Sequence, residues 1–245
     1  MNLIKNFKKP LFAIALAGAF TACSDDDDSL SVEDGNGKLG IYASANYSPN
    51  AGKNTVLDGP VVEMSKFLIN LEEIELEYDD IIGDDNFYNS EEDIELKGPF
   101  ELDLLSPTPV VVTVVDAPNG RLEEIEFEFD KNENPDSEIY EQSIRMEGTI
   151  DGVPFVFWHD FEEELEVEFD EGETNTVISN DQNSVVINFD LNSVFDATTG
   201  VDLSNAVDGN GDGIIEINPN DEDGNRDIAD AMKEHIKDKI DLLDD

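Results

Sequence analysis

The chain has 245 residues, and its 60 acidic residues against 14 basic residues give a formal net charge of −46 at pH 7. A charge of this sign and size repels nucleic acids and anionic lipid headgroups, which excludes proteins that bind either through a basic surface. The single cysteine excludes an internal disulfide framework. Because hydrophobic residues make up 39% of the chain and fall in periodic runs, we expect a folded core over most of its length rather than disorder.

Residues 1–22 have the three zones of a secretory signal peptide. The positive start carries Lys5, Lys8 and Lys9, and an apolar run follows over residues 11–20. This run is about half as long as a membrane-spanning helix, and small residues come directly after it. The segment is therefore predicted to be a lipoprotein signal peptide rather than a transmembrane helix.

Cys23 directly follows this segment, which indicates a lipobox with Cys23 as the lipidated first residue of the mature chain. Phe20 departs from the Leu that is usual three positions before such a cysteine. A free buried thiol is the alternative, and it is disfavoured because the aspartates at 25–28 cannot be buried unpaired. Several acyl chains, palmitate among them, would give a firm anchor in the outer membrane.

An acidic run follows the cysteine: Ser24, Asp25, Asp26, Asp27 and Asp28. This order resembles the export signal of Bacteroidota-type surface lipoproteins, and the resemblance implies display on the outside of the cell. The alternative is a plain acidic tether, since charge runs are usually solvated. Residues 23–37 are thus expected to form the lipidated cysteine and a flexible tether. Folded structure is expected from Lys38, with Leu39, Ile41 and Ala43 on one face of a strand.

Three segments alternate strictly between apolar and acidic residues. They cover residues 72–79, 123–130 and 163–170, and each begins with two glutamates. A period of two places one face of a strand in the core and the other in solvent, whereas a helix would scatter these residues around its circumference. We therefore expect three half-buried strands. An internal repeat is an alternative origin, and convergent patterning of exposed strands is the interpretation we favour.

Further strand candidates fill the gaps between these segments, at residues 61–70, 100–104, 110–115, 143–150, 153–158 and 185–191. The β-branched run 110–115 is expected to be buried on both faces, and Asp151-Gly152 predicts a tight hairpin. So many short strands indicate a mainly β fold, an antiparallel β-sandwich or open barrel, over residues 38–200.

Residues 208–216 fit the first nine positions of an EF-hand calcium loop, D-x-N-x-D-G with an acid at the ninth position. The predicted ligands are Asp208, Asn210, Asp212, the carbonyl of Ile214, and Glu216. Hard cations prefer several close oxygens, and Gly213 allows the tight turn. Pro219 occupies the twelfth position, where a bidentate Glu is usual, so Asp221 or Asp223 is considered as a replacement. The alternative is a plain acidic, glycine-rich turn.

A second oxygen-rich loop at residues 221–227 precedes a run of apolar residues at helical spacing, Ile228, Met232, Ile236, Ile240 and Leu243. This spacing predicts a C-terminal amphipathic helix packed on the β domain. Residues 201–245 are therefore expected to form a cation-binding loop and a helix that belong to the same domain.

Known catalytic sequence patterns are absent: there is no G-x-S-x-G, H-E-x-x-H, C-x-x-C or complete P-loop. His159 and His235 each stand alone in the sequence, as structural histidines commonly do. Trp158, Phe155 and Phe157 suggest a sugar-stacking surface, although the alternation with Val156 indicates that part of this set is core. Paired carboxylates of the glycosidase type stay open as an alternative, because so many acids juxtapose somewhere in any fold.

The chain as a whole resembles uncharacterised Bacteroidota-type lipoproteins with a β-sandwich domain of unknown function. The matching features are Cys23 with its acidic run, Phe67-Leu68-Ile69-Asn70, Val115-Asp116-Ala117-Pro118 and the loop at 208–216. The resemblance implies surface display and no reaction. We expect a non-catalytic binding or scaffold module, stabilised by calcium, with an extracellular glycan or protein as its ligand. The alternative is a carbohydrate-active enzyme.

Overall fold

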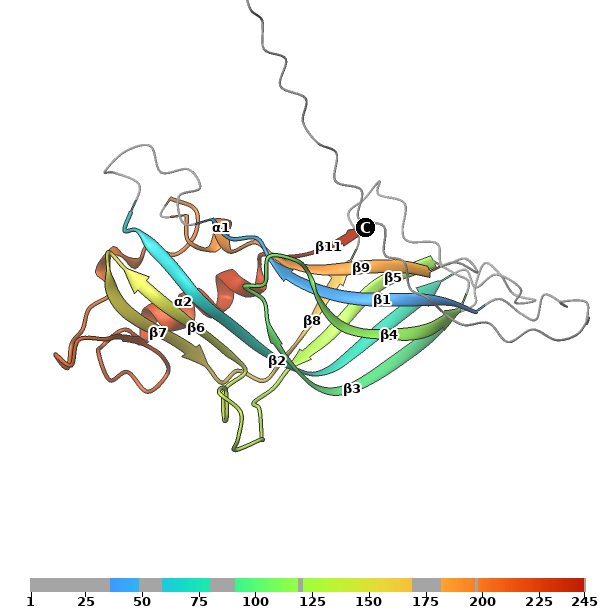
Figure 1. The fold of residues 1–245 in the computed structure, drawn as a ribbon, viewed down its shortest axis with the longest axis horizontal. Coiled ribbons are helices and arrows are strands. Elements are labelled where there is room, and N and C mark those ends of the chain that lie inside the picture. The colour runs from blue at the N-terminus through green and yellow to red at the C-terminus, as the bar shows by residue number, and fades with distance from the viewer. Residues whose placement is uncertain are drawn as a thin grey trace, which may run out of the picture. The chain divides into compact units, whose positions relative to one another are not determined.

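The computed structural model describes residues 36–48, 59–79, 91–118, 121–168, 182–196 and 198–244 (Figure 1). All of them belong to one compact unit, Asp34–Asp245. Within these described ranges, no helix has both the length and the apolar character that crossing a membrane requires.

The smaller sheet has four strands in the order β11-β9-β1-β4. Its members are β1 (Asn36–Ala45), β4 (Val110–Pro118), β9 (Gln182–Phe189) and β11 (Ile240–Asp244). β1 pairs antiparallel with β4 but parallel with β9, and β11 pairs antiparallel with β9. Leu39, Ile41 and Ala43 on β1 are fully buried, which confirms that they share one face of a strand.

The larger sheet is built on β2 (Val62–Asp79), a strand of 18 residues. Its other members are β3 (Glu91–Asp103), β5 (Arg121–Phe129), β6 (Ile144–Ile150), β7 (Val153–His159), β8 (Glu163–Glu168) and β10 (Ile215–Ile217). The first half of β2 pairs with β6, and β7 and β10 follow beyond it. The second half pairs with β5 on one edge and with β3 on the other, and β8 lies beyond β5.

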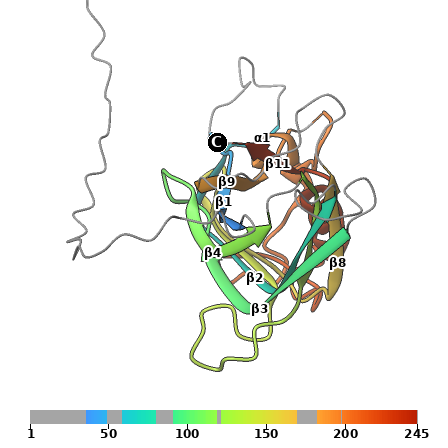
Figure 2. The same ribbon diagram turned by 90° about the vertical axis from the view of Figure 1, so that its right-hand side faces the viewer.

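The two sheets share one core. In Figure 2 the strands surround a common interior, and β3 comes close to β4 while β8 comes close to β11. Aromatic rings join the sheets across this interior, because Phe189 of β9 stacks edge-on against Phe67 of β2 at 5.7 Å and against Phe129 of β5 at 6.5 Å. Such edge-to-face pairs add stability beyond the area they bury.

Three short helical elements follow β9: α1 (Leu191–Val194), the 3-10 helix η2 (Leu203–Asn205) and α2 (Arg226–Lys237). The predicted helix through Leu243 is wrong beyond Lys237. There the chain turns, and Ile240 and Leu242 enter the core on β11 rather than on a helix. Ile240 fits both patterns, since it follows Ile236 at helical spacing and alternates with Leu242 as in a strand. Pairing with β9 decided for the strand.

The prediction of a mainly β fold is confirmed, and so is the hairpin between β6 and β7, where Asp151 and Gly152 have φ of 49° and 82°. The expectation of antiparallel sheets is wrong for two pairings, β1 with β9 and β10 with β7. The expectation that residues 110–115 are buried on both faces is also wrong. β4 is an edge strand with one face in solvent, so Val111 is 54% and Val114 is 48% exposed.

Candidate functional site

The three acidic segments form parts of β2, β5 and β8, which are neighbouring strands of the larger sheet. Their apolar residues, such as Ile74 and Phe127, are fully buried, so the alternating acids point outward. We call the resulting surface the acidic face. Its acids are Glu73, Glu75, Glu77, Asp93, Glu95, Glu124, Glu126, Glu128, Glu164 and Glu166.

The strand register sets these acids directly opposite one another. One row runs Glu95–Glu75–Glu126–Glu166, and its neighbours run Asp93–Glu77–Glu124 and Lys97–Glu73–Glu128–Glu164. Like charges directly opposite in a sheet are destabilising. Lys97 is the basic residue at these register positions, where it pairs with Glu73 and lies 3.4 Å from Glu95. The remaining rows therefore need protons or solution cations to relieve their repulsion.

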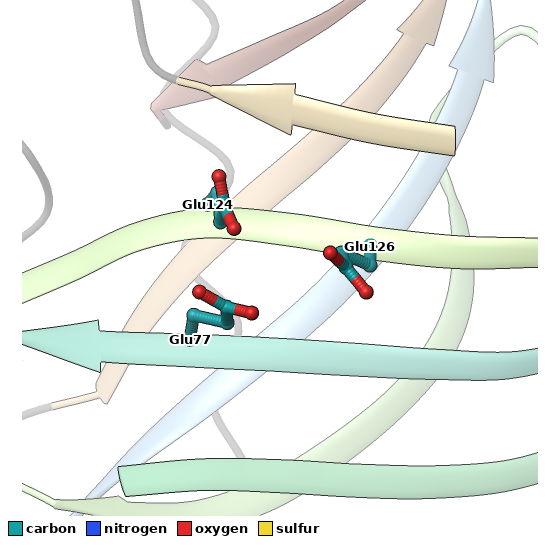
Figure 3. Close-up of side chains that lie close together, drawn as sticks. All are labelled: Glu77, Glu124 and Glu126. Carbon is teal, nitrogen blue, oxygen red and sulfur yellow. The ribbon is translucent and has the colours of Figure 1, made fainter. Parts of the chain in front are cut away.

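The repulsion is strongest around Glu77, Glu124 and Glu126, and Figure 3 shows Glu77 on β2 directed toward the two glutamates on β5. One carboxylate oxygen from each lies within 4.8 Å of the others, and no other such group of three occurs among the described residues. Burial, followed by hydrogen bonds with Glu77 and Glu166, raises the pKa of Glu124 to about 8. Burial and the hydrogen bond with Glu164 raise the pKa of Glu126 to about 7.

Near neutral pH, protonated Glu124 and Glu126 donate hydrogen bonds to their neighbours in place of repelling them. A divalent cation would neutralise the same oxygens. The sequence predicted each acidic strand but not that the three strands would be adjacent or in this register. The shared alternation was the available signal, because it gives each of the three strands one apolar face for the same core.

The predicted calcium loop, Asp208–Glu216, is a tight turn held by its own side chains. Asp208 Oδ1 accepts hydrogen bonds from the amides of Gly211 at 2.7 Å and Asp212 at 3.1 Å, and Oδ2 accepts from Gly213 at 2.9 Å. Gly213 has φ of 96°, so the turn uses its freedom as predicted. Asn210 Oδ1 accepts from the amide of Asp212 at 2.9 Å.

Glu216 on β10 lies next to the loop, where its Oε2 accepts a hydrogen bond from Nδ2 of Asn210 at 2.8 Å. Burial and the charges of Glu222, Asp212 and Asp223 raise the pKa of Glu216. The structure therefore brings Asn210 and Glu216 into contact, and Asp208 and Asp212 into the same turn. Ile214 is 39% exposed, and its amide donates to Asp212. The acids of the loop do not form a group of three within 4.8 Å.

Asp223 is the acid that reaches back to this loop. Its side chain is buried, its Oδ1 accepts from the amide of Asn210 at 2.9 Å, and its Oδ2 accepts from the amide of Glu216 at 2.7 Å. A Cβ on Gly209 would lie 2.3 Å from the carbonyl oxygen of Asp223, so only glycine fits there. The carboxylate of Asp223 thus holds both ends of the loop by accepting hydrogen bonds from their backbone amides. Asp221 instead accepts from the amide of Arg226 at the start of α2.

Cys23 and the export residues Ser24, Asp25, Asp26, Asp27 and Asp28 lie outside the described residues. Lipidation and surface export therefore stay predictions.

Two adjoining cavities lie where the chain leaves β5 and β7, and together we call them the groove. They have volumes of about 450 Å³ and about 390 Å³ and share Lys131, Tyr140 and Glu141. The larger is also lined by Asp130, Glu133 and Glu162, and the smaller by Gln142, Trp158, Asp160 and Asn220. The sequence did not predict this groove, since its lining comes from segments far apart in the chain.

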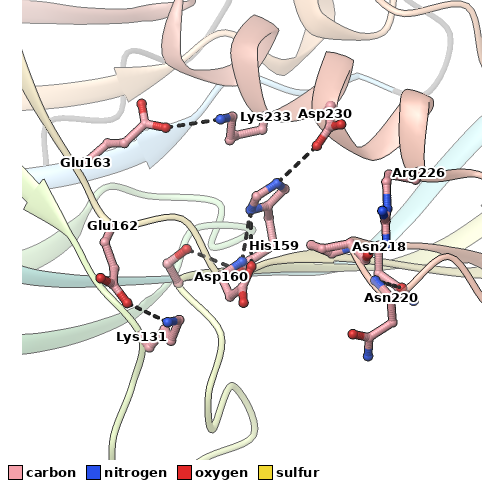
Figure 4. Close-up of polar contacts among 12 residues, drawn as sticks. Lys131, His159, Asp160, Glu162, Glu163, Asn218, Asn220, Arg226, Asp230 and Lys233 are labelled. Carbon is pink, nitrogen blue, oxygen red and sulfur yellow. Dashed lines mark hydrogen bonds and ion pairs between the residues drawn. The ribbon is translucent and has the colours of Figure 1, made fainter.

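Figure 4 shows the polar contacts behind the groove. Lys131 pairs with Glu162. His159 is buried, its Nδ1 accepts from the amide of Asp160 at 2.9 Å, and its Nε2 lies 3.5 Å from Asp230 of α2. Burial lowers the pKa of His159, against the raising effect of Asp230, so the ring is neutral at neutral pH with its proton on Nε2. His159 therefore links β7 to α2.

The suggested aromatic surface divides between core and groove. Phe155 and Phe157 are buried, whereas Trp158 alternates to the other face, is half-buried and lines the groove.

Comparisons with models of known protein families, with curated proteins and with solved structures gave no match.

Proposed function

We propose that the chain is a lipid-anchored, surface-exposed envelope protein that acts as a non-catalytic binding or scaffold module and is stabilised by calcium. The observation that carries this proposal is the acidic face, whose carboxylates stand in register on a regular, outward-facing sheet. A rigid array of this kind suits binding of cations and of cationic partners. The array also agrees with a β-sandwich domain whose acidic residues face solvent and whose apolar residues form the core.

The calcium part of the proposal draws on the loop and on the charge of the whole chain. Asn210 and Glu216 already touch, and negative charges surround Glu216. A bound ion would neutralise these carboxylates and hold the turn that leads into α2. Without a bidentate twelfth ligand, affinity should fall at the millimolar end for extracellular modules, and calcium at ten times Kd would then stabilise the fold by about 1.4 kcal/mol.

Anchoring is tested by labelling cells with palmitate. The unmodified protein should carry label, with processing blocked by globomycin, and Cys23→Ala should carry none; label on that variant would refute lipidation. Replacing Asp25–Asp28 by alanine should leave the protein lipidated but protected from added protease on intact cells. If the variant stays accessible to protease, the acidic run at residues 25–28 is a plain tether and not an export signal.

Calcium binding is tested by melting curves with calcium against magnesium at fixed ionic strength, since screening alone stabilises so acidic a chain. Calcium should raise the midpoint more than magnesium, and Asp208→Ala with Asp212→Ala should remove the difference. A charge-matched control is Asp136→Ala with Asp241→Ala, two exposed aspartates outside the loop and the acidic face, which should keep the difference. If both ions raise the melting midpoint equally, and the loop variant shows the same rise, the loop is only an acidic turn and does not bind calcium.

A carbohydrate-active enzyme is the second candidate, favoured by the raised pKa of Glu124 close to Glu77. A carboxyl with a raised pKa can serve as the general acid beside a second carboxyl group. The test is hydrolysis of a panel of oligosaccharides, with loss of activity in Glu124→Gln. Activity that survives this substitution would remove the pair from consideration.

A further inference from the structure

The groove presents aromatic rings to solvent, whereas most other aromatic residues in the described part of the chain are buried. Tyr140 is 42% exposed, and Trp158 is the chain's only tryptophan. They come from different segments, the loop before β6 and the end of β7, yet both line the smaller cavity. A partly open cavity with aromatic walls and a few polar groups has the features of a ligand site.

The polar atoms of the groove are mainly acceptors. Its lining carries five acids, Asp130, Glu133, Glu141, Asp160 and Glu162, against one base, Lys131. The ammonium group of Lys131 is already paired with Glu162. Within the part of the chain that the structure describes, the carboxylates of Glu133 and Glu141 have no hydrogen-bond or ion-pair partner. The groove therefore offers free carboxylate acceptors and an excess of negative charge.

We propose that the groove binds the ammonium or guanidinium groups of a basic peptide segment. These groups are donors only, so they match a lining of free carboxylates without leaving an acceptor of their own unpaired. They are also attracted to the faces of tryptophan and tyrosine rings. A sugar hydroxyl carries no charge and would leave the negative charge of the groove unbalanced, and a bare metal ion would make no use of the rings.

The groove is held in shape by a buried pair of amides beneath it. Asn132 Nδ2 donates to Asn70 Oδ1 at 3.0 Å, and Asn70 Nδ2 donates to the carbonyl of Asp130 at 2.9 Å. The amide of Glu141 donates to the carbonyl of Asn132 at 2.8 Å, so the two lining segments are tied together. A site fixed in advance loses less entropy when its ligand binds.

Glu141 has a backbone that is rare for its residue type, with φ of 59°. A residue other than glycine in this region carries strain, which the surrounding structure must hold, and such residues cluster at functional sites. Here the strained residue carries one of the free carboxylates and lines both cavities.

This inference names a ligand class for the proposed binding module and rests on that proposal for its setting at the cell surface. The tests of lipidation and calcium use Cys23, the acidic run after it and the predicted calcium loop. A negative result for lipidation or calcium binding would therefore leave the groove proposal intact. A negative result for the groove would leave those two proposals intact.

The experiment titrates the purified protein with a blocked tri-arginine peptide, and with its uncharged tri-citrulline counterpart, at fixed ionic strength. Fluorescence of Trp158 reports on the groove alone, and calorimetry gives Kd. Tri-arginine should change the emission and tri-citrulline should not. Glu141→Gln with Asp160→Asn should weaken binding about tenfold, the loss expected from two exposed charge contacts.

The control for unspecific attraction is Glu63→Gln with Asp241→Asn, which makes the same two changes at exposed acids outside the groove and the acidic face and should change Kd less than about twofold. Equal weakening by both double variants would overturn the proposal, as would emission that does not respond to tri-arginine. Emission that responds to uncharged oligosaccharides and not to tri-arginine would assign the groove to a glycan and would also overturn it.

Discussion

At the scale of single residues, the buried amide of Asn70 joins β2 to the segment after β5. The side chain is fully buried, and it both donates to Asp130 and accepts from Asn132. Asn70→Ala would remove the donor to the Asp130 carbonyl and one of the two acceptors of Asn132 Nδ2, which keeps Glu101 at 3.1 Å, so we expect the free energy of unfolding to fall by about 1–2 kcal/mol. Urea denaturation monitored by circular dichroism measures this change.

The matched control is Asn220→Ala, the same substitution at an exposed residue that also lines the groove. Its effect should stay within about 0.5 kcal/mol, as for most surface substitutions. If Asn70→Ala changes the free energy of unfolding as little as Asn220→Ala does, the amide pair does not hold the groove in its shape.

Asp223 gives a second prediction at this scale. It is 5% exposed and accepts from two backbone amides, one at each end of the calcium loop. Asp223→Ala should lower the free energy of unfolding by about 2 kcal/mol, because both amides lose a charged acceptor. It should also reduce the difference between calcium and magnesium in the melting curves, since the loop ends would no longer be held. Glu222→Ala, the adjacent exposed acid, is the control; a full calcium effect in Asp223→Ala would show that this contact to the loop ends is not needed.

At the scale of elements, the sequence predicted strands well where alternation was strict, as in β2, β5 and β8. It failed where two periods coincided: Ile236 and Ile240 fit a helix, yet only Ile236 lies on one. It also failed at β4, because a run of β-branched residues does not show whether its strand will be central or at an edge. The tight turn at residues 208–216 was predicted from local spacing, and its calcium binding stays a prediction, whereas the contacts of Asp223 depend on how the two loops fold together.

The acidic face predicts an unusual pH dependence of stability. Glu124 and Glu126 hold protons more tightly in the folded than in the unfolded chain, since their pKa values are raised from 4.5 to about 8 and about 7. Stability from these groups is therefore greatest at low pH and is lost as pH rises from about 5 through 7 to 8. Glu124→Gln with Glu126→Gln should be about 1–2 kcal/mol more stable than the unmodified protein at pH 8 and nearly equal to it at pH 5.

The measurement is urea denaturation at several pH values, and the difference between the two proteins cancels titrations elsewhere in the chain. Glu138→Gln provides a control of opposite sign. The ion pair with Lys66, at 2.8 Å, lowers the pKa of Glu138, so its stabilisation is present above the unfolded pKa and is lost as pH falls. A double variant that is less stable than the unmodified protein at pH 8 would contradict the repulsion we assign to the acidic face.

At the scale of the whole molecule, the order of the strands could not be predicted from the sequence. β1 and β9 are parallel neighbours although 136 residues separate Ala45 from Gln182 in the chain, and such pairing needs a long connection that no local pattern reveals. The same long-range pairing brings the acidic strands together and gathers the groove from loops far apart. Both candidate surfaces are therefore products of topology, whereas the calcium loop and the signal segment are predictions that rest on local sequence patterns alone.

The net charge of −46 leads to the last prediction, that salt stabilises the fold even without divalent cations. Repulsion among carboxylates opposes the compact state, and monovalent salt shortens its reach from roughly 30 Å at 0.01 M to about 8 Å at 0.15 M. The melting midpoint in sodium chloride with a calcium chelator should rise steeply over this range and level off above it. Rows of the acidic face are closer together than 8 Å and so stay poorly screened. At pH 8, the variant Glu124→Gln with Glu126→Gln should then melt higher than the unmodified protein by a similar margin at both salt concentrations. A margin that vanishes at 0.15 M would mean that the acidic face acts only through the long-range field of the chain, and not through the short contacts among Glu77, Glu124 and Glu126.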